Sequence, residues 1–582
     1  MAAAKSYCRS ADLGGKFLNK AFGLLVATLI VASPADAQNI APSVLSPSDV
    51  QAYRAIFAAQ ESGELSTADT LVAKLHDQIL LGYVLHQRYM GRYYITKFQE
   101  LSTWLSEYPD HFEANRIYNL ALRKKGGGTR NPRSPARARW RGERFEQEAA
   151  DFAAMNSNRG ARIMRQLRSF AANDDPASAE NTVKQVSVSS NLPEDDLDRL
   201  HSYVASAYLA ENRDGDARRV AQTGLRDGSS AAVQLHWTAG LAAYRMGDFI
   251  SAARHFEDME RLSGDSARDS ATGAFWAARA HMRAGNPAPV LPHYESAANN
   301  RFTFYGALAT RIIGRDSDLE FEEPRLDPYS YSQLIENDAA RRAIALWQVG
   351  RQDAVETELA RAFGKMNPSL DPAFAALARF LGATALELRA AETSAARGIF
   401  LTSLYPVPPY EPEGGYRLDQ AMVLAVARQE SRFDPDATSR AGARGLMQIM
   451  PTTAAYITKD PSLARGNSTR LDDPSYSMRV GQDYLLALLE RQNGNLFGLT
   501  AAYNAGLGNL SRWLAQQEGN DDPVLFIESL PSPETRDYVK RVMVNMWMYQ
   551  QRFGDPALGM DDAASGNWPT YPLLDRIAAV TW

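Results

Sequence analysis

Gly240–Met259, with the sequence GLAAYRMGDFISAARHFEDM, is the stretch that indicates how most of the chain folds. Small and apolar residues recur at helical spacing on both sides of Gly247, which predicts two helices joined by a tight turn. Similar units occur at 276–297 (WAARAHMRAGNPAPVLPHYESA) and 345–363 (ALWQVGRQDAVETELARAF). Each helix pair can bury its apolar face only by stacking on its neighbours, so the repeat predicts a curved α-solenoid.

The helical pattern continues over most of the chain and makes the predicted fold class all-α. Leu200, Val204 and Tyr208 recur at helical spacing, for example, and extended runs of Val, Ile and Thr between turns are scarce. The hairpin at Gly240–Met259 is similar to a tetratricopeptide hairpin. We therefore predict a TPR-like α-solenoid domain over residues 38–400, in which the small residues serve close helix packing.

The N-terminus has the pattern of a secretory signal. Basic residues as far as Lys20 precede the run AFGLLVATLIVA, and small residues at Ala35–Ala37 suit a cleavage site. The run has 12 residues, too few to span a bilayer. Residues 1–37 are therefore predicted to be a signal peptide, and the mature protein is expected to be exported, to begin at Gln38 and to have no stable membrane anchor.

Composition excludes several kinds of partner and site. The chain has 582 residues and a formal net charge of −5, so it has several domains and lacks the basic balance of a nucleic-acid-binding protein. The only cysteine, Cys8, lies within the predicted signal. No disulfide, zinc–thiolate site or cysteine nucleophile is therefore expected, and no metal-ligand cluster or cofactor motif is evident.

Two composition changes mark boundaries along the chain. Residues 123–144, RKKGGGTRNPRSPARARWRGER, hold nine Lys or Arg and one Glu, which predicts either a solvated loop between helices or a site for an anionic partner. The Pro- and Gly-rich segment LYPVPPYEPEGGYRL predicts a linker at 401–415. A compact block at 416–555 and a tail at 556–582 follow.

Glu430 is the candidate catalytic residue of this block. It continues the apolar face of Met422 and Val426, and Pro435 ends the helix shortly after it. Burial and the negative end of the helix dipole both favour the protonated carboxyl, which a general acid requires. The alternative from this segment alone is an exposed salt bridge at the end of a helix.

A second carboxylate would indicate ordinary two-acid glycoside hydrolysis, and Asp434 is the nearest candidate. The sequence FDPDATS instead predicts a turn in which Asp434 or Asp436 accepts hydrogen bonds from backbone N–H groups.

Four separated motifs carry a family resemblance. They are ARQESRFDPDATSRAGARGLMQIMPTTA, LDDPSYSMRVGQDYLLALLE, AAYNAGLGNLSRWL and IESLPSPETRDYVKRVM, all between residues 427 and 543. Their order and spacing resemble those of the soluble lytic transglycosylases, lysozyme-like enzymes that cleave peptidoglycan in the periplasm. The resemblance implies a lysozyme-like, mainly α catalytic domain after an N-terminal α-superhelix, with peptidoglycan glycan strands as the partner.

The resemblance also implies the roles of single residues. Glu430 matches the only catalytic carboxylate of the family. The residues that match substrate-binding positions are Ser439, Gln448, Met450, Tyr503, Asn504, Glu534 and Tyr538. Two positions depart from the usual pattern, because Ser477 stands where Asn is common and Leu507 replaces a Pro.

The implied reaction needs only one acid. The acetamido carbonyl of the substrate attacks the anomeric carbon, and Glu430 acts first as acid and then as base to form a 1,6-anhydro product. A lysozyme-type hydrolase and an exported scaffold that binds peptidoglycan or proteins are the alternatives.

Overall fold

The computed structural model describes residues 41–136, 155–189, 192–226, 228–315, 321–517 and 521–572. These residues form helices and turns, and no β-strand occurs among them; extended pairing is limited to isolated bridges such as Glu322 with Leu401. The all-α prediction is confirmed. The predicted signal peptide and residues 137–144 of the basic segment lie outside these ranges. None of the described helices combines the length and apolarity needed to cross a membrane.

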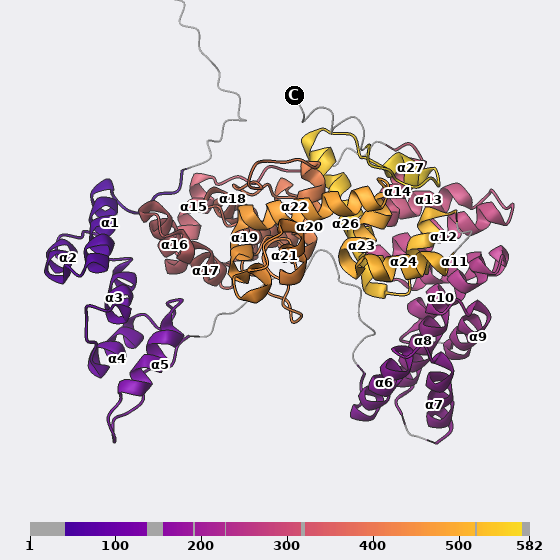
Figure 1. The fold of residues 1–582 in the computed structure, drawn as a ribbon, viewed down its shortest axis with the longest axis horizontal. Helices are drawn as coiled ribbons and strands as arrows, with labels where there is room; N and C mark the ends of the chain where they lie inside the picture. Colours follow the sequence, from indigo (N-terminus) through magenta and orange to yellow (C-terminus); the bar gives the residue numbers. More distant parts are fainter. Residues whose placement is uncertain are drawn as a thin grey trace, which may run out of the picture.

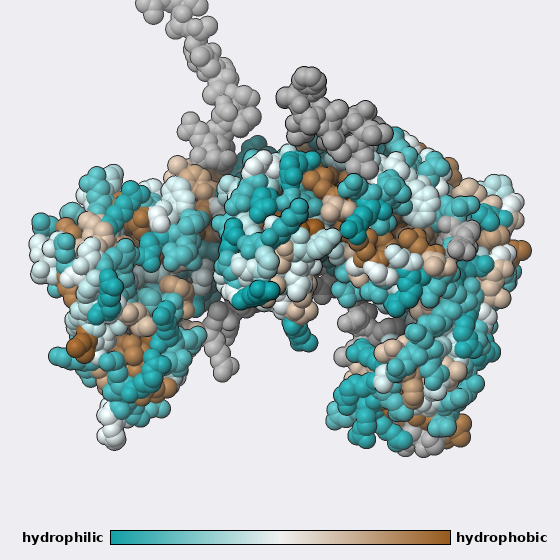
Figure 2. All heavy atoms as spheres, viewed as in Figure 1, coloured by the Kyte–Doolittle hydropathy of each residue, from teal (hydrophilic) through white to brown (hydrophobic). Residues whose placement is uncertain are grey.

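The solenoid is an arch of paired helices with one arm at each end (Figure 1). Hydrophilic side chains cover most of the face of both arms in Figure 2, as expected for surfaces in contact with water. The first arm contains α1 (Pro47–Ser62), α2 (Leu65–Val72), α3 (Leu81–Met90), α4 (Phe98–Glu107) and α5 (Ala114–Lys124). The second arm contains α6 (Asn158–Ala171), α7 (Pro176–Ser189), α8 (Glu194–Ala210) and α9 (Asp214–Gly224).

Two further runs of helices complete the solenoid. The first continues from α9 with α10 (Ala232–Arg245), α11 (Phe249–Leu262), α12 (Ala267–Arg283), α13 (Val290–Ala298) and α14 (Phe304–Ile312). The second lies beside the first arm and contains α15 (Pro328–Ile335), α16 (Asp338–Val349), α17 (Gln352–Phe363), α18 (Asp371–Phe380) and α19 (Thr384–Ala395).

The hairpin predicted from Gly240–Met259 is the pair α10 and α11. Gly247 lies in the turn with φ of 78°, a left-handed conformation that glycine adopts without strain. Gly240 allows the two helices to approach closely, since a Cβ atom there would lie 2.7 Å from the ring of Phe256. Both glycines therefore have the structural role that the repeat pattern predicted.

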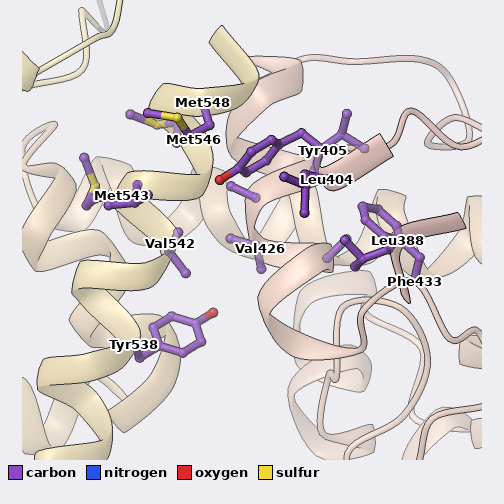
Figure 3. Close-up of a cluster of buried hydrophobic side chains, with 14 of the residues drawn as sticks. Leu388, Leu404, Tyr405, Val426, Phe433, Tyr538, Val542, Met543, Met546 and Met548 are labelled. Atoms are coloured by element: carbon purple, nitrogen blue, oxygen red, sulfur yellow. The ribbon is translucent and has the colours of Figure 1, made fainter. Parts of the chain in front are cut away.

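The C-terminal block is built around α20, whose apolar residues pack against α26. Figure 3 shows Val426 of α20 and Val542 of α26 in the buried layer between the two helices. The helices of the block are α20 (Gln420–Glu430), α21 (Pro451–Thr458), α22 (Pro474–Arg491), α23 (Leu496–Ala505), α24 (Leu507–Ala515), α25 (Pro523–Ser529), α26 (Pro533–Phe553) and α27 (Met560–Ala564).

The block and the solenoid share one apolar core. The ring of Phe304 in α14 stacks on Trp547 of α26 with 5.6 Å between centroids, and both side chains are buried. Polar contacts also join the two parts, because Tyr305 donates a hydrogen bond to the buried carboxylate of Glu528 and Arg279 pairs with Asp522. The two parts are therefore packed together through buried side chains.

The segment that joins the two parts is also packed at its start. Leu401, Leu404 and Tyr405 are at most 1% exposed, and Pro406 is buried beside them. The Gly residues follow later, where Gly414 and Gly415 both have positive φ. The predicted 401–415 linker thus begins as part of the core and becomes a turn only near its end.

The described part of the tail returns to the body of the protein. α27 packs against α14, and the ring of Trp568 lies 5.0 Å from that of Phe526. The Tyr571 hydroxyl accepts a hydrogen bond of 3.1 Å from the backbone N–H of Asp419, the residue that caps α20. The tail therefore supports the start of the helix that carries Glu430.

Candidate active site

Glu430 is the last residue of α20, as its sequence context predicts. The helix stops there because Arg432 and Phe433 both adopt positive φ, at 55° and 65°. The Ser431 hydroxyl donates a hydrogen bond to the carbonyl of Ala427 and accepts one from the N–H of Phe433, both at 3.1 Å. These bonds fix the conformation of the turn that follows Glu430. They therefore also fix the place at which the Glu430 side chain extends from the end of α20.

The surroundings of Glu430 favour its protonated form. Burial raises the pKa of the carboxyl to about 7, and the negative charge of Glu534 acts in the same direction. The Tyr538 hydroxyl opposes these effects, because it donates a 2.7 Å hydrogen bond to Glu430 Oε1 and stabilises the anion. The result is a carboxyl that can exchange a proton near neutral pH.

Two tyrosine rings form a wall beside this carboxyl. The rings of Tyr503 and Tyr538 are nearly parallel, 8° apart, with 6.3 Å between centroids. Tyr503 comes from α23, and its hydroxyl donates a 2.8 Å hydrogen bond to the carbonyl of Met447. Burial and the nearby Glu430 hold the pKa of both phenols well above the usual value, so both remain neutral hydrogen-bond donors.

Asn504 and Glu534 meet at the outer edge of the tyrosine wall. Asn504 Nδ2 lies 3.4 Å from Glu534 Oε1, and its Oδ1 accepts a 2.7 Å hydrogen bond from Thr535. Thr535 is buried, whereas Glu534 is exposed at the start of α26. The arrangement fixes the Asn504 amide and leaves the Glu534 carboxylate accessible to a ligand.

Ser439, Gln448 and Met450 lie on the loop 431–450 between α20 and α21. The Ser439 hydroxyl accepts a 3.0 Å hydrogen bond from the N–H of Ala443. Gln448 has a φ of 44°, and its Nε2 donates to the carbonyls of Ala437 and Gly445, both at 2.9 Å. The Met450 side chain is 37% exposed. Gln448 therefore closes the loop, and Met450 presents an apolar side chain to solvent or ligand.

Gly445→Ala is expected to destabilise this loop by about 2–3 kcal/mol. Gly445 has a φ of 73°, and an added Cβ would lie 1.8 Å from the carbonyl oxygen of Leu471, so the backbone must move. The matched control is Gly442→Ala, where φ is 91° but nothing lies within 4 Å. Gly442→Ala is expected to lower the free energy of unfolding by only about 1 kcal/mol, through conformational strain alone. Urea unfolding of both variants measures the difference, and equal losses would contradict the role of the contact.

Asp434 occupies a turn, as its sequence predicts. Its Oδ1 accepts a 3.0 Å hydrogen bond from the backbone N–H of Asp436. Burial raises the pKa of Asp434; the hydrogen bond from the Asp436 N–H opposes this effect, and the negative charge of Asp436 adds to it. The side chain therefore has a local structural role that explains its presence near Glu430.

A cleft of about 1020 Å³ lies between the solenoid and the residues that follow Glu430. Phe380 and Tyr410 line it together with residues 431–436. Glu356 of α17 also faces it, and burial together with the charges of Asp434 and Asp436 raises its pKa to about 7. Glu356 is not evident as a site residue from the sequence, because it lies within an ordinary repeat helix. Only the fold brings α17 and residues 431–436 to the same cleft.

Residues 410–526 match the family model of the transglycosylase SLT domain. This segment is similar to an SLT domain, and we refer to it as the SLT domain. Its helix α20 supplies Glu430, and its later helix α23 supplies Tyr503 and Asn504. Glu534 and Tyr538 lie beyond its matched end, on α26.

Relatives named soluble lytic murein transglycosylase align with this part of the chain. The protein of that name from Escherichia coli K12 is 40% identical over 142 residues, 24% of this chain and 22% of the relative. The one from Salmonella typhimurium is 38% identical over 151 residues, 26% of this chain and 23% of the relative. Each alignment thus spans less than a quarter of the length of the relative.

Solved structures extend the likeness of fold to nearly the whole chain. The complex of the 70-kDa soluble lytic transglycosylase with bulgecin A matches with a TM-score of 0.63 at 19% identity, covering 90% of this chain and 99% of that chain. The lytic transglycosylase Slt from Pseudomonas aeruginosa matches with a TM-score of 0.53 at 20% identity, covering 87% and 74%. The solenoid and the SLT domain are therefore combined here in a known architecture.

Proposed function

We propose that this protein is a lytic transglycosylase that cleaves the β-1,4 bond between N-acetylmuramic acid and N-acetylglucosamine in peptidoglycan. The observation that carries the proposal is Glu430, a partly buried carboxyl with a pKa of about 7 at the end of an SLT-domain helix. Such a carboxyl can donate a proton at neutral pH and take one back later in the same reaction.

The proposed mechanism uses Glu430 twice. As an acid, Glu430 protonates the glycosidic oxygen while the acetamido carbonyl of the muramic acid attacks the anomeric carbon and the glycosidic bond breaks. As a base, the Glu430 carboxylate then removes the proton of the C6 hydroxyl of the same sugar. The C6 oxygen attacks the anomeric carbon and displaces the acetamido oxygen, which leaves a 1,6-anhydro ring and a reprotonated Glu430. Holding this hydroxyl over the carbon contributes an effective molarity worth several kcal/mol.

The other proposed site residues bind and orient the sugars. Tyr538 directs the Glu430 carboxyl through its hydrogen bond, and the ring of Tyr503 lies nearly parallel to that of Tyr538. Exposed Glu534 and Met450 are available to contact sugar hydroxyls and apolar ring faces. Ser439, Gln448 and Asn504 complete the set by shaping the loop 431–450 and the edge of the site. No cofactor or nucleic acid takes part in the proposed reaction.

The solenoid is proposed to position long glycan strands rather than to perform chemistry. Support comes from the cleft between α17 and the residues after Glu430, which is large enough for sugar rings and presents exposed Phe380. The proposed substrate also places the protein in the periplasm after export, consistent with the predicted signal at 1–37.

Mass spectrometry of the fragments released from purified sacculi tests the proposal. A transglycosylase releases anhydro-muropeptides, which are lighter by one water than the products of a hydrolase acting on the same bond. Release of the heavier products alone would replace the proposal with a lysozyme-type hydrolase. Binding to sacculi with no release of fragments would indicate the scaffold alternative.

Tyr538→Phe is expected to shift the alkaline limb of the pH–rate profile to higher pH. The lost hydroxyl stabilises the Glu430 anion, so its removal raises the pKa of Glu430 and keeps the acid protonated further into the alkaline range. Initial rates of anhydro-muropeptide release across pH measure this shift. Tyr484→Phe is the control, because Tyr484 contacts the ring of Tyr503 rather than Glu430. A shift to lower pH in Tyr538→Phe would contradict the assigned hydrogen bond.

A further inference from the structure

Three successive solenoid helices bring metal-ligating side chains together, far from Glu430 in the sequence. Glu257 of α11, His281 of α12 and His293 of α13 each offer one ligand atom, and these atoms lie within 4.8 Å of one another. The side chains are 39%, 13% and 18% exposed, respectively, so an ion can enter from solvent. No metal-ligand cluster is evident in the sequence, because these residues are widely spaced and only the stacking of the hairpins juxtaposes them.

The imidazoles are oriented toward one point. His281 Nε2 lies 2.8 Å and His293 Nε2 3.5 Å from the same oxygen, Glu257 Oε1. The two rings are nearly parallel, 9° apart, with 5.7 Å between centroids. Ligands at about 2.0–2.1 Å from a tetrahedral zinc ion are separated by roughly 3.3 Å. Small side-chain movements would therefore bring the two imidazole nitrogens and the carboxylate oxygen to the separations that a bound ion requires.

The outer nitrogens of both imidazoles are held by a second layer of polar groups. His293 Nδ1 lies 3.0 Å from Glu260 Oε2, and the other oxygen of Glu260 accepts a 2.5 Å hydrogen bond from Ser296. A carboxylate at Nδ1 keeps the proton on that nitrogen and leaves the Nε2 lone pair for a metal. His281 Nδ1 lies 3.2 Å from the side-chain amide of Asn286, which would present its oxygen to Nδ1–H in the metal-bound form.

We propose that Glu257, His281 and His293 bind one divalent transition-metal ion, with Zn²⁺ as the expected occupant. Two imidazoles and a carboxylate form a donor set that Zn²⁺ commonly accepts, and water completes the coordination at the exposed side. The Glu257 carboxylate offsets part of the charge of the ion, and Glu260 offsets more through His293.

The proposed ion crosslinks the part of the solenoid that supports the SLT domain. α12 carries His281 and also Arg268 and Arg279, which pair with Asp537 of α26 and with Asp522. An ion that links α12 to α11 and α13 therefore stabilises the helix that contacts α26. The role is structural, since the three ligands belong to the solenoid and the reacting carboxyl belongs to α20.

Zinc titration of the untagged full-length protein tests the proposal. After removal of metal with a chelator, calorimetry is expected to show one Zn²⁺ per chain, and saturating Zn²⁺ is expected to raise the melting temperature by about 2–5 °C. Co²⁺ in place of Zn²⁺ is expected to give the visible absorption of a site with nitrogen ligands. His281→Gln and His293→Gln are each expected to weaken Zn²⁺ binding roughly 100-fold, and Glu260→Gln about tenfold, as for a residue that acts through a ligand.

His236→Gln is the matched control. His236 lies on the neighbouring helix α10, with its Nδ1 3.1 Å from His255 Nδ1, outside the proposed trio. It is expected to leave Zn²⁺ affinity unchanged, and circular dichroism of each metal-free variant checks that the solenoid remains folded. Absence of stoichiometric binding by the folded parent would overturn the proposal. Loss of binding in His236→Gln with retention in His281→Gln would also overturn it and move the site to the His236–His255 pair.

Discussion

Glu430→Gln is expected to slow the release of anhydro-muropeptides by about 10³-fold or more while the protein remains folded. The amide cannot donate a proton to the glycosidic oxygen or remove one from the C6 hydroxyl, so both steps of the proposed reaction are lost. The Gln side chain keeps the size of Glu and can still accept the hydrogen bond from Tyr538. Rates on purified sacculi, with circular dichroism as the folding check, measure the effect.

Asp434→Asn is the control for this result. Asp434 is the nearest other carboxylate in the sequence, but its oxygen accepts a hydrogen bond from the N–H of Asp436, and an Asn oxygen can do the same. Most of the parent rate is therefore expected to remain. If both variants fold and both lose activity equally, a two-carboxylate mechanism replaces the proposed one.

Glu430→Gln is also expected to change how the free energy of unfolding depends on pH. The ordinary pKa of 4.5 applies to Glu430 in the unfolded chain, and the folded value is about 7. The folded state therefore binds more protons between these values, and the free energy of unfolding falls as pH rises from 4.5 to 7. Above pH 7 the ionised Glu430 costs the folded state at most about 3 kcal/mol. Glu430→Gln is expected to melt at a higher temperature than the parent at pH 8, with little gain at pH 4. A gain that is independent of pH would show that ionisation is not its cause.

Phe304→Ala is expected to destabilise the protein by about 3–5 kcal/mol, although Phe304 belongs to the solenoid. The substitution leaves a cavity against Trp547 and also removes the contact with Phe497, 6.0 Å away between ring centroids. Both partners belong to the C-terminal block, so tryptophan fluorescence should report the loss there. Thermal and urea unfolding measure it.

Phe380→Ala provides the comparison on an exposed phenylalanine. Phe380 is 42% exposed and contacts Trp347 of the solenoid, so its truncation is expected to cost about 1 kcal/mol or less. If Phe304→Ala costs no more than Phe380→Ala, the block is stabilised independently of α14, contrary to the shared core.

The sequence predicted those features that depend on short-range patterns. The repeat at Gly240–Met259 gave the correct hairpin, because a turn glycine and an apolar face are sufficient to specify one. The end of α20 at Glu430 and the turn at Asp434 were likewise local. The hydrogen bond from Tyr538 to Glu430 was different, since the family resemblance indicated the residue but no pattern in the sequence places its hydroxyl.

The features that the sequence did not reveal depend on contacts between distant segments. The Pro- and Gly-rich composition of 401–415 indicated a linker, yet Leu401 and Tyr405 are buried in the core. Composition indicates how flexible an isolated segment would be. It does not show whether neighbouring helices pack against that segment. Glu356 and the trio of Glu257, His281 and His293 were missed for the same reason.

Because Tyr538 belongs to α26, the matched segment alone would not be sufficient to transfer the proposed site to another protein. The matched SLT domain ends at 526, but the donor that contacts Glu430 comes from α26, Pro533–Phe553. The residue before it, Asp537, pairs with Arg268 of the solenoid, and Trp547 on the same helix packs against Phe304. A graft limited to the family boundary would carry Glu430 without Tyr538, and one extended through α26 would carry apolar surface that its new host must cover. In gene fusion, the smallest portable unit is therefore larger than the domain that defines the family.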